Sequence, residues 1–360
     1  MKAAVCRTFG TPLELEELEL SPPEQGEVCV ELAACAICHS DIALAEGAWG
    51  GELPAVYGHE AAGVVRDVGP GVTDVGVGDR VVVGLVRSCG RCFFCAHGQP
   101  HLCAGSFPAD SRPVLRTTRG EPVLHALHTA AFAEQVVVDE SQVAVLPESL
   151  PLDVGSVLGC GVLTGVGAAL DRARVAPGSS VVVVGTGGVG VNVVQGAAIA
   201  GADTIVAFDV SAAKRDAAAR FGATHAVDPA DDPLGAVREL TGGRGADYVF
   251  VSVGRGDVIA GAVAYARRGG TVVVVGMPPA DETFELVAVD VVHDDVSVLG
   301  TKIGSGSGLF RDAVARLVGL HEEGRLKLDE LVTARYPLTE INGAIAAAGG
   351  DALRNVIVFG

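Results

Sequence analysis

The sequence predicts an α/β plus β protein in which a doubly wound parallel-sheet domain is inserted into a β-rich domain, with a functional cleft between the two. Residues 1–154 show short alternating apolar segments separated by glycine turns, which is typical of antiparallel strands. Residues 155–302 alternate strand and helix patterns, as parallel sheets require. Residues 303–360 return to the first domain, and 360 residues suffice for two domains.

The β-rich part begins with alternating apolar and polar positions over residues 1–35, in ELEELEL and then EVCVELAACAI. Residues 59–83 continue with short strands and glycine turns, and residues 132–146 resume strand character. Together these segments predict a small, barrel-like β domain. Residues 104–130 contain three prolines and are expected to form an irregular surface lobe.

The inserted part begins with four consecutive valines, Val181 to Val184, which predict a strand buried on both faces. Helices are expected over Val191–Ala200 and Ala212–Phe221. Further strands are expected at Thr204–Phe208, His225–Val227, Tyr248–Val253, Thr271–Val275 and Val296–Leu299. After Thr301 the sequence predicts a glycine-rich loop (Gly304–Gly308), an amphipathic helix (Leu309–Leu320) and a final strand (Asn355–Phe359).

Charge and composition restrict the function. The formal net charge of −18 argues against nucleic acid or an anionic membrane as a partner. The first residues lack the apolar core of a signal peptide, and no apolar run approaches the length of a membrane span. We therefore expect a soluble, cytoplasmic protein. The acidity itself does not identify a partner, and solubility is its ordinary explanation.

The segment VVVVGTGGVGVNVVQGAAIAGADTIVAFD has the strand–turn–helix–strand pattern of a dinucleotide-binding unit. Gly185 permits the tight turn, Gly187 lets the backbone approach a diphosphate, and Gly190 allows close helix packing. Asp209 follows about twenty residues on, where its carboxylate would accept ribose hydroxyls and repel a 2′-phosphate, which favours NAD over NADP. The expected contacts in the turn are Gly185, Gly187, Gly188, Val189 and Gly190.

Four of the nine cysteines are clustered with the spacing C-x2-C-x2-C-x7-C: Cys89, Cys92, Cys95 and Cys103. Four thiolates at these intervals would surround one zinc ion tetrahedrally and leave no open position, which indicates a structural zinc lobe at about residues 86–105. Disulfides are the alternative, but cysteines so close in sequence would form strained loops, and the expected compartment is reducing.

A second set of metal-ligating residue types is dispersed along the chain. Cys38, His59 and Cys160 supply two thiolates and one imidazole, a ligand set of catalytic zinc sites whose fourth position takes water or substrate. None of the three is specific alone, because single histidines and cysteines are more often structural. Glu60 is a possible further ligand, and Asp41 is suited to accept a hydrogen bond from His59. The Ser40 hydroxyl is a candidate proton relay.

The chain resembles the zinc-containing alcohol dehydrogenases of the medium-chain dehydrogenase/reductase superfamily, and is similar to its class III and bacterial NAD-dependent branch. The resemblance covers essentially the whole length. It depends on CHSD, GHEAAGVV, the four-cysteine lobe, GCGVLTG and GTGGVG, in this order. It implies a GroES-like catalytic domain (1–154 and 303–360), a Rossmann NAD-binding domain (155–302), NAD as cofactor and two zinc ions per chain, one catalytic and one structural.

The resemblance also implies roles for single residues. Cys38, His59 and Cys160 would hold the catalytic zinc beside Glu60, with zinc stabilising the alkoxide of the alcohol while Ser40 relays its proton. Ala43 stands where many relatives have a histidine that completes this relay. The remaining expected cofactor contacts are His39, Thr164, Lys214, Val253, Val275, Met277 and Arg354.

The expected reaction is reversible hydride transfer between a primary or secondary alcohol and NAD. Two alternatives share the scaffold. One is a formaldehyde dehydrogenase that acts on a thiol adduct, suggested by GEPVLHALHTAAFAE. The other is a nicotinoprotein that holds NAD tightly and passes electrons to another acceptor. A non-catalytic nucleotide-binding protein is a distant alternative, because all the ligand residues are present. The family also implies a homodimer or homotetramer, with a subunit edge in the segment 271–301.

Overall fold

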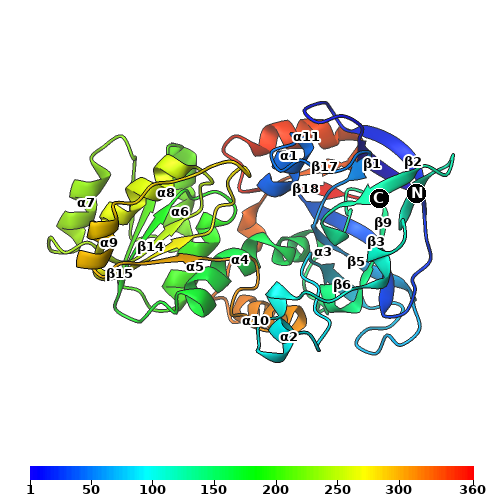
Figure 1. The fold of residues 1–360 in the computed structure, drawn as a ribbon, viewed down its shortest axis with the longest axis horizontal. Coiled ribbons are helices and arrows are strands. Elements are labelled where there is room, and N and C mark those ends of the chain that lie inside the picture. The colour runs from blue at the N-terminus through cyan, green and yellow to red at the C-terminus, as the bar shows by residue number, and fades with distance from the viewer. The chain divides into compact units, whose positions relative to one another are not determined.

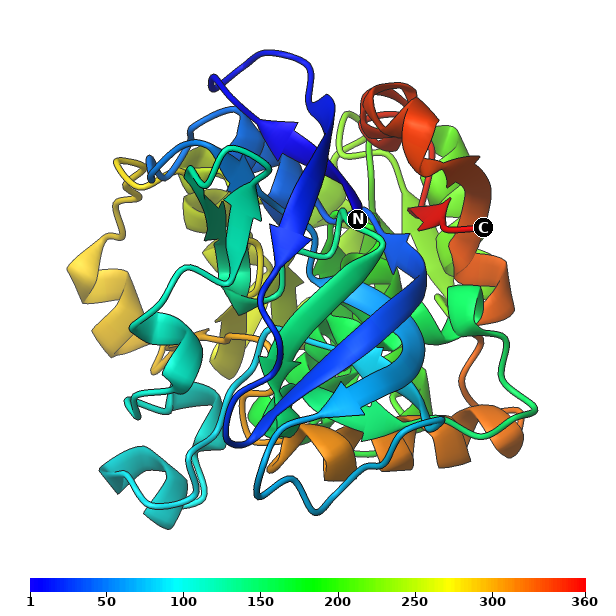
Figure 2. The same cartoon turned by 90° about the vertical axis from the view of Figure 1, so that its right-hand side faces the viewer.

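The structure is a computed structural model that describes residues 1–360 as two compact units (Figure 1). The β-rich unit comprises residues 1–163, 307–324 and 328–360, and the Rossmann unit comprises residues 164–306 and 325–327. Both chain ends belong to the β-rich unit (Figure 2). Its boundary with the Rossmann unit falls after residue 163 rather than 154, because the helical segment that includes Leu152–Gly155 and Ser156–Gly159 packs on the β-rich sheet.

The β-rich unit contains a closed barrel and a seven-stranded sheet. The barrel has the order β1-β2-β7-β8-β4, and its strands are β1 (Lys2–Cys6), β2 (Glu14–Leu20), β7 (Leu115–Thr117), β8 (Pro122–His125) and β4 (Ala55–Val56). The sheet has the order β10-β6-β5-β3-β18-β17, with β9 also paired to β3. Its strands are β10 (Val143–Val145), β6 (Arg80–Val83), β5 (Glu60–Val68), β3 (Glu27–Ala36), β18 (Arg354–Val358), β17 (Val332–Pro337) and β9 (Gln135–Asp139).

The last strand explains why the chain returns to its first domain. β18 pairs antiparallel with β3, so that Val356 lies opposite Ala36 and the C-terminal segment completes the N-terminal sheet. The helices of this unit are α1 (His39–Ala45), α2 (Phe93–Ala96), α3 (Leu152–Gly155), α10 (Phe310–Glu322) and α11 (Ile341–Ala348). α10 buries one apolar face, as its sequence predicts, and packs on β10.

The Rossmann unit is a six-stranded parallel sheet with the order β13-β12-β11-β14-β15-β16. Its strands are β13 (His225–Val227), β12 (Thr204–Phe208), β11 (Ser180–Val184), β14 (Ala246–Val251), β15 (Ala266–Val274) and β16 (Ser297–Gly300). The helices are α5 (Gly190–Ile199), α6 (Ala212–Arg220), α7 (Pro233–Leu240), α8 (Gly256–Ala262) and α9 (Ala288–His293). This strand order is that of a doubly wound dinucleotide-binding sheet. The predicted fold class, a β-rich domain with an inserted doubly wound parallel-sheet domain, is confirmed.

The expected surface lobe over residues 104–130 is wrong in part. The structure places β7 and β8 in this segment, and both strands belong to the closed barrel. Leu115 and Val123 are buried in the core of the unit. Their burial stabilises these strands although the prolines of the segment disfavour regular structure. Pro122 is tolerated because it is the first residue of its strand.

No single helix is long and apolar enough to cross a membrane. The consecutive bent segments Leu152–Gly159 and Gly161–Arg172, which include α4 (Gly161–Gly167), satisfy that criterion only as a pair. Most residues of this pair are buried within the fold.

Candidate functional sites

The dispersed metal-ligating residues come together in the β-rich unit. One donor atom from each of Cys38, His59, Glu60 and Cys160 lies within 4.8 Å of all the others, and all four residues are buried. Cys38 is the N-cap of α1, His59 and Glu60 stand at the start of β5, and Cys160 lies between a 3-10 turn and α4. Residues from three separate segments thus converge on one point in the interior.

The imidazole of His59 has a defined orientation. Its Nδ1 atom lies 2.8 Å from Oδ1 of Asp41, whereas its buried Nε2 atom has no hydrogen-bond partner. Asp41 also accepts hydrogen bonds from the backbone N–H groups of Gly58 (3.0 Å) and Cys38 (3.1 Å). A buried ring nitrogen without a partner is costly unless it binds a metal, and a carboxylate on the other nitrogen is the usual second contact of a metal-bound histidine.

The electrostatics of the cluster are those of a cation site. A hydrogen bond with Cys160 lowers the pKa of Cys38 well below its usual value, with help from the charge of His59, although burial acts in the opposite direction. The same hydrogen bond and burial raise the pKa of Cys160. The charges of Asp41 and Cys38 raise the pKa of His59 despite its burial. Two sulfurs and one imidazole with an unpaired nitrogen therefore fit zinc, which compensates buried negative charge.

Glu60 is paired with Arg354, the first residue of β18. The Arg354 Nη2 atom lies 3.2 Å from Oε1 of Glu60, and both side chains are buried. Burial nevertheless raises the pKa of Glu60 to about 8. A Cβ atom at Gly161 would lie only 2.2 Å from Arg354 Nη2, so the second glycine of GCG makes room for this guanidinium. Arg354 therefore contacts the metal cluster, where the sequence suggested a cofactor contact.

The remaining predicted residues of this unit lie on α1. His39 is exposed, and Ser40 is partly buried in the first turn, two residues after Cys38. Ala43 lies one turn further along the helix and is partly buried.

The other four predicted ligands form a second cluster. One Sγ atom from each of Cys89, Cys92, Cys95 and Cys103 lies within 4.8 Å of the others, and none of the nine cysteines forms a disulfide. Backbone N–H groups point at the sulfurs: that of Cys92 donates to Cys89 Sγ (3.4 Å), and that of Gly105 donates to Cys103 Sγ (3.3 Å). Backbone hydrogen bonds also lower the pKa of Cys92 to about 6. Four converging sulfurs that accept N–H bonds fit a structural zinc ion.

The glycine turn of the Rossmann unit has the shape that a diphosphate requires. Gly185 has φ +83°, which favours glycine, and a Cβ atom at Gly190 would lie 1.8 Å from the Gly185 carbonyl oxygen. A Cβ atom at Gly187 would meet nothing within 4 Å, so the backbone there is accessible. The turn ends at Gly190, the first residue of α5, whose N-terminus is suited to an anion. Gly188 and Val189 complete the turn.

Asp209 follows β12 and is held by its neighbours. Its Oδ2 atom accepts hydrogen bonds from the backbone N–H (2.8 Å) and the hydroxyl (3.2 Å) of Thr186. Its Oδ1 atom accepts from the N–H of Ser211 (2.9 Å), whose own hydroxyl caps α6 at Lys214. The remaining candidates of this unit are Thr164 in α4, Val253 after β14, and Val275 and Met277 after β15.

Sequence reasoning missed Thr129, which supports the first cluster. The hydroxyl of Thr129 and the N–H of Ala131 both donate to the carbonyl of Gly58, next to His59, at 2.9 Å. Leu127, His128 and Ala130 have φ values of 53°, 58° and 52°, so three non-glycine residues near Thr129 are strained. The segment lies within GEPVLHALHTAAFAE, which suggested a class of substrate but not a contact to the metal cluster.

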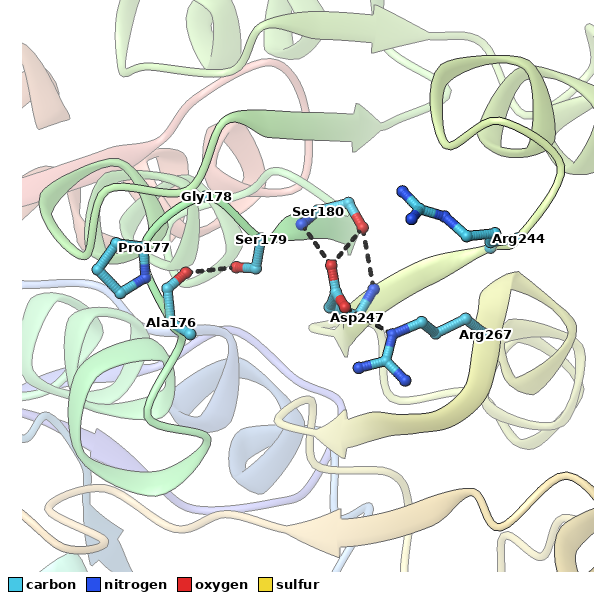
Figure 3. Close-up of a pocket in the computed structure, with 9 residues that line it drawn as sticks. Ala176, Pro177, Gly178, Ser179, Ser180, Arg244, Asp247 and Arg267 are labelled. Carbon is cyan, nitrogen blue, oxygen red and sulfur yellow. Dashed lines mark hydrogen bonds and ion pairs between the residues drawn. The ribbon is translucent and has the colours of Figure 1, made fainter.

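The cavity drawn in Figure 3 has a volume of about 340 Å³ and lies in the Rossmann unit. Ser180, Asp247 and Arg267, at the starts of β11, β14 and β15, contribute to its lining. Dinucleotides bind beyond the carboxyl ends of parallel strands, where the glycine turn and Asp209 lie. This cavity is therefore at the wrong edge of the sheet for the cofactor.

Two family models match the chain: "Alcohol dehydrogenase GroES-like domain" over residues 24–148 and "Zinc-binding dehydrogenase" over residues 188–319. An "NDMA-dependent alcohol dehydrogenase" of Amycolatopsis methanolica is 40% identical, with 99% of this chain and 98% of the relative covered. An "Alcohol dehydrogenase class-3" of Cereibacter sphaeroides is 36% identical over 99% of both chains. The crystal structure of benzyl alcohol dehydrogenase from Acinetobacter calcoaceticus matches with a TM-score of 0.92 and 30% identity, over 100% of this chain and 99% of the other.

Proposed function

The chain belongs to the zinc-containing alcohol dehydrogenases of the medium-chain dehydrogenase/reductase superfamily, and on that premise we propose that this oxidoreductase moves a hydride reversibly between an alcohol and NAD. The observation that carries the proposal is the buried His59 Nε2 atom, which has no hydrogen-bond partner and belongs to a cluster with Cys38 and Cys160. Such a set provides three protein ligands and leaves a fourth position for substrate.

We propose two zinc ions per chain, one at each cluster. Cys38, His59 and Cys160 would hold the catalytic ion, while Asp41 fixes the tautomer and direction of His59. When bound, zinc supplies a Lewis acid that lowers the pKa of a substrate hydroxyl, and NAD supplies the hydride acceptor. The four-cysteine cluster would stabilise its lobe and take no part in the reaction.

The cofactor assignment to NAD depends on the Rossmann unit. The accessible backbone at Gly187 and the N-terminus of α5 would receive the diphosphate, and Asp209 would accept the hydroxyls of the adenosine ribose. Thr186 and Ser211 keep the Asp209 carboxylate in one orientation through three hydrogen bonds. An ionised carboxylate held there would repel a 2′-phosphate.

The proton of the substrate hydroxyl would leave by way of α1. The Ser40 hydroxyl, two residues after Cys38, would take the proton of the alcohol. Ala43 has no titratable group, so the next acceptor would be a cofactor hydroxyl or water rather than a protein side chain.

One other version of this function has specific support. The relative from Amycolatopsis methanolica is described as NDMA-dependent, which favours a cofactor that stays on the protein and is reoxidised there by a separate acceptor. The class-3 relative similarly suggests a thiol adduct of formaldehyde as a substrate. We also propose that the chain forms a homo-oligomer, since β16 leaves one edge of the Rossmann sheet open.

The test is to follow NADH absorbance with zinc-loaded protein, NAD and a panel of aliphatic and aryl alcohols, with and without thiol plus formaldehyde. Turnover of free alcohols supports the main proposal, and turnover only with the thiol adduct supports the class-3 version. A rise limited to one equivalent of NADH, which an artificial hydride acceptor reverses while the aldehyde or ketone product then forms continuously, supports the tightly held cofactor. No reduction under any of these conditions, with zinc and NAD bound, would contradict all three. Light scattering on the same sample gives the oligomeric state.

A further inference from the structure

A guanidinium stands next to the residue that selects the cofactor. Arg215 belongs to α6, and its Nη1 atom donates to the carbonyl oxygens of Asp209 (2.8 Å) and Val210 (3.1 Å). The same nitrogen lies 2.9 Å from Oδ2 of Asp228, the residue after β13. The side chains of Arg215 and Asp228 are 21% and 30% exposed, so the ion pair is only partly screened by water.

The two carboxylates near this point have different contacts. The Asp209 carboxylate accepts hydrogen bonds from Thr186 and Ser211, and Arg215 contacts only the main chain of Asp209. The Asp228 carboxylate, by contrast, is directly paired with the guanidinium. Asp209 is therefore oriented independently of Arg215, and Asp228 is the acid that holds Arg215 in place.

This arrangement matters for a dinucleotide with a 2′-phosphate. Such a phosphate is best recognised by a guanidinium, whose planar donors match its oxygens. Proteins that use NADP commonly place an arginine near the residue that corresponds to Asp209. In this chain an arginine is already there, but its Nη1 atom is bound to two carbonyl oxygens and one carboxylate.

We propose that Asp228 is a second specificity-determining residue, which favours NAD by holding Arg215 away from the 2′-position of the adenosine ribose. Asp209 repels the 2′-phosphate, and Asp228 forms an ion pair with Arg215, the cation that would otherwise attract this phosphate. Specificity therefore comes from a repulsive group and from a masked attractive group. This inference rests on the proposed binding of NAD at Asp209.

The experiment measures the affinities for NADH and NADPH by fluorescence titration of the full chain after any bound dinucleotide has been removed. In Asp228→Asn the carboxylate is lost and the shape is kept, so we expect NADPH to bind roughly 10- to 100-fold more tightly, the equivalent of one hydrogen bond to a charged group. The affinity for NADH should change less than twofold. In the double variant Asp228→Asn/Arg215→Gln, NADPH affinity should return to the wild-type value.

A matched control separates masking from a general change of charge. Asp294→Asn removes a carboxylate from another arginine pair of the same unit, with Arg268 at 3.0 Å, near the amino ends of the strands. Its NADPH affinity should stay at the wild-type value. An equal rise in Asp294→Asn, an unchanged NADPH affinity in Asp228→Asn, or a rise that persists without Arg215 would overturn the proposal.

A second set of variants tests the inference in the absence of the repulsive carboxylate of Asp209. In Asp209→Ser the pair of Asp228 with Arg215 is intact, so adding Arg215→Gln should change the NADPH affinity less than twofold, whereas adding Asp228→Asn should raise it at least threefold. An NADPH affinity in Asp209→Ser/Asp228→Asn equal to that of Asp209→Ser would overturn the proposal. If wild-type protein bound neither dinucleotide, the proposed NAD function itself would fail, an outcome distinct from a failure of the masking argument.

Discussion

Replacing Asp41 by asparagine should weaken zinc binding at the buried cluster. Oδ1 of Asp41 accepts from His59 Nδ1 and from the Gly58 N–H, while Oδ2 accepts from the Cys38 N–H. An asparagine that keeps its oxygen toward His59 must turn its amide NH2 toward the Cys38 N–H, so one bond is lost and two donors face each other. The opposite orientation loses two bonds.

The size of the effect follows from these contacts. A hydrogen bond to a charged group is worth about 1.5–3 kcal/mol, and about 1.4 kcal/mol corresponds to a factor of ten in affinity. We therefore expect the zinc affinity of this cluster to fall roughly 10- to 100-fold, as is usual when the partner of a metal-bound histidine is changed. The measurement is a competition titration with a chromophoric chelator, which resolves two sites per chain.

The matched control is Asp139→Asn. Asp139 caps a short 3-10 turn through the N–H of Ser141 at 3.0 Å and belongs to neither cluster. It should lower thermal stability slightly and leave both zinc affinities unchanged. If Asp41→Asn bound zinc at both sites as tightly as wild type, the orienting role of Asp41 would be refuted.

Three further outcomes are expected. Gly190→Ala should prevent stable folding of the Rossmann unit, because its Cβ would lie 1.8 Å from the Gly185 carbonyl oxygen. Gly187→Ala should keep the wild-type melting temperature and lose NADH binding. Thermal melts and NADH titrations of both variants test this pair of outcomes. Cys95→Ser should halve the zinc content measured by atomic absorption and lower the melting temperature; two retained zinc ions would contradict the four-cysteine site. Burial lowers the pKa of His125 to about 3 from 6.5, so native protein binds fewer protons than unfolded protein, and stability falls as pH drops below 6.5. As the pH falls from about 6.5 to 4, the free energy of unfolding of His125→Gln, measured with urea, should rise relative to that of wild type by about 1.4 kcal/mol per pH unit. Parallel pH profiles of the two proteins would refute this.

The features that the sequence predicts best are those set by short spacing or by a buried strand. Cys89 and Cys92 cluster because three residues of chain restrict how far apart their sulfurs lie. The four valines of β11 indicate a central strand because no polar position interrupts them. The dispersed cluster was also found, although only the joint presence of CHSD, GHE and GCG pointed to it.

The features that the sequence did not predict depend on tertiary contacts. β8 begins with proline and was expected to be irregular, but barrel closure supplies its partners. Thr129 supports Gly58 from 71 residues away, and a threonine has no motif of its own. Arg215 and Asp228 meet because α6 and β13 pack together, a contact that local periodicity does not contain.

The most direct test of the account is a single-turnover measurement with wild-type protein and Cys38→Ser. Each is loaded with zinc and NAD and mixed with benzyl alcohol or its α-deuterated form, and NADH absorbance is followed. If the buried cluster carries the reaction, wild type shows a burst of about one equivalent of NADH that deuterium slows. Cys38→Ser, which keeps the zinc of the four-cysteine cluster, shows no burst. An equal burst in Cys38→Ser would show that the buried cluster does not carry the reaction.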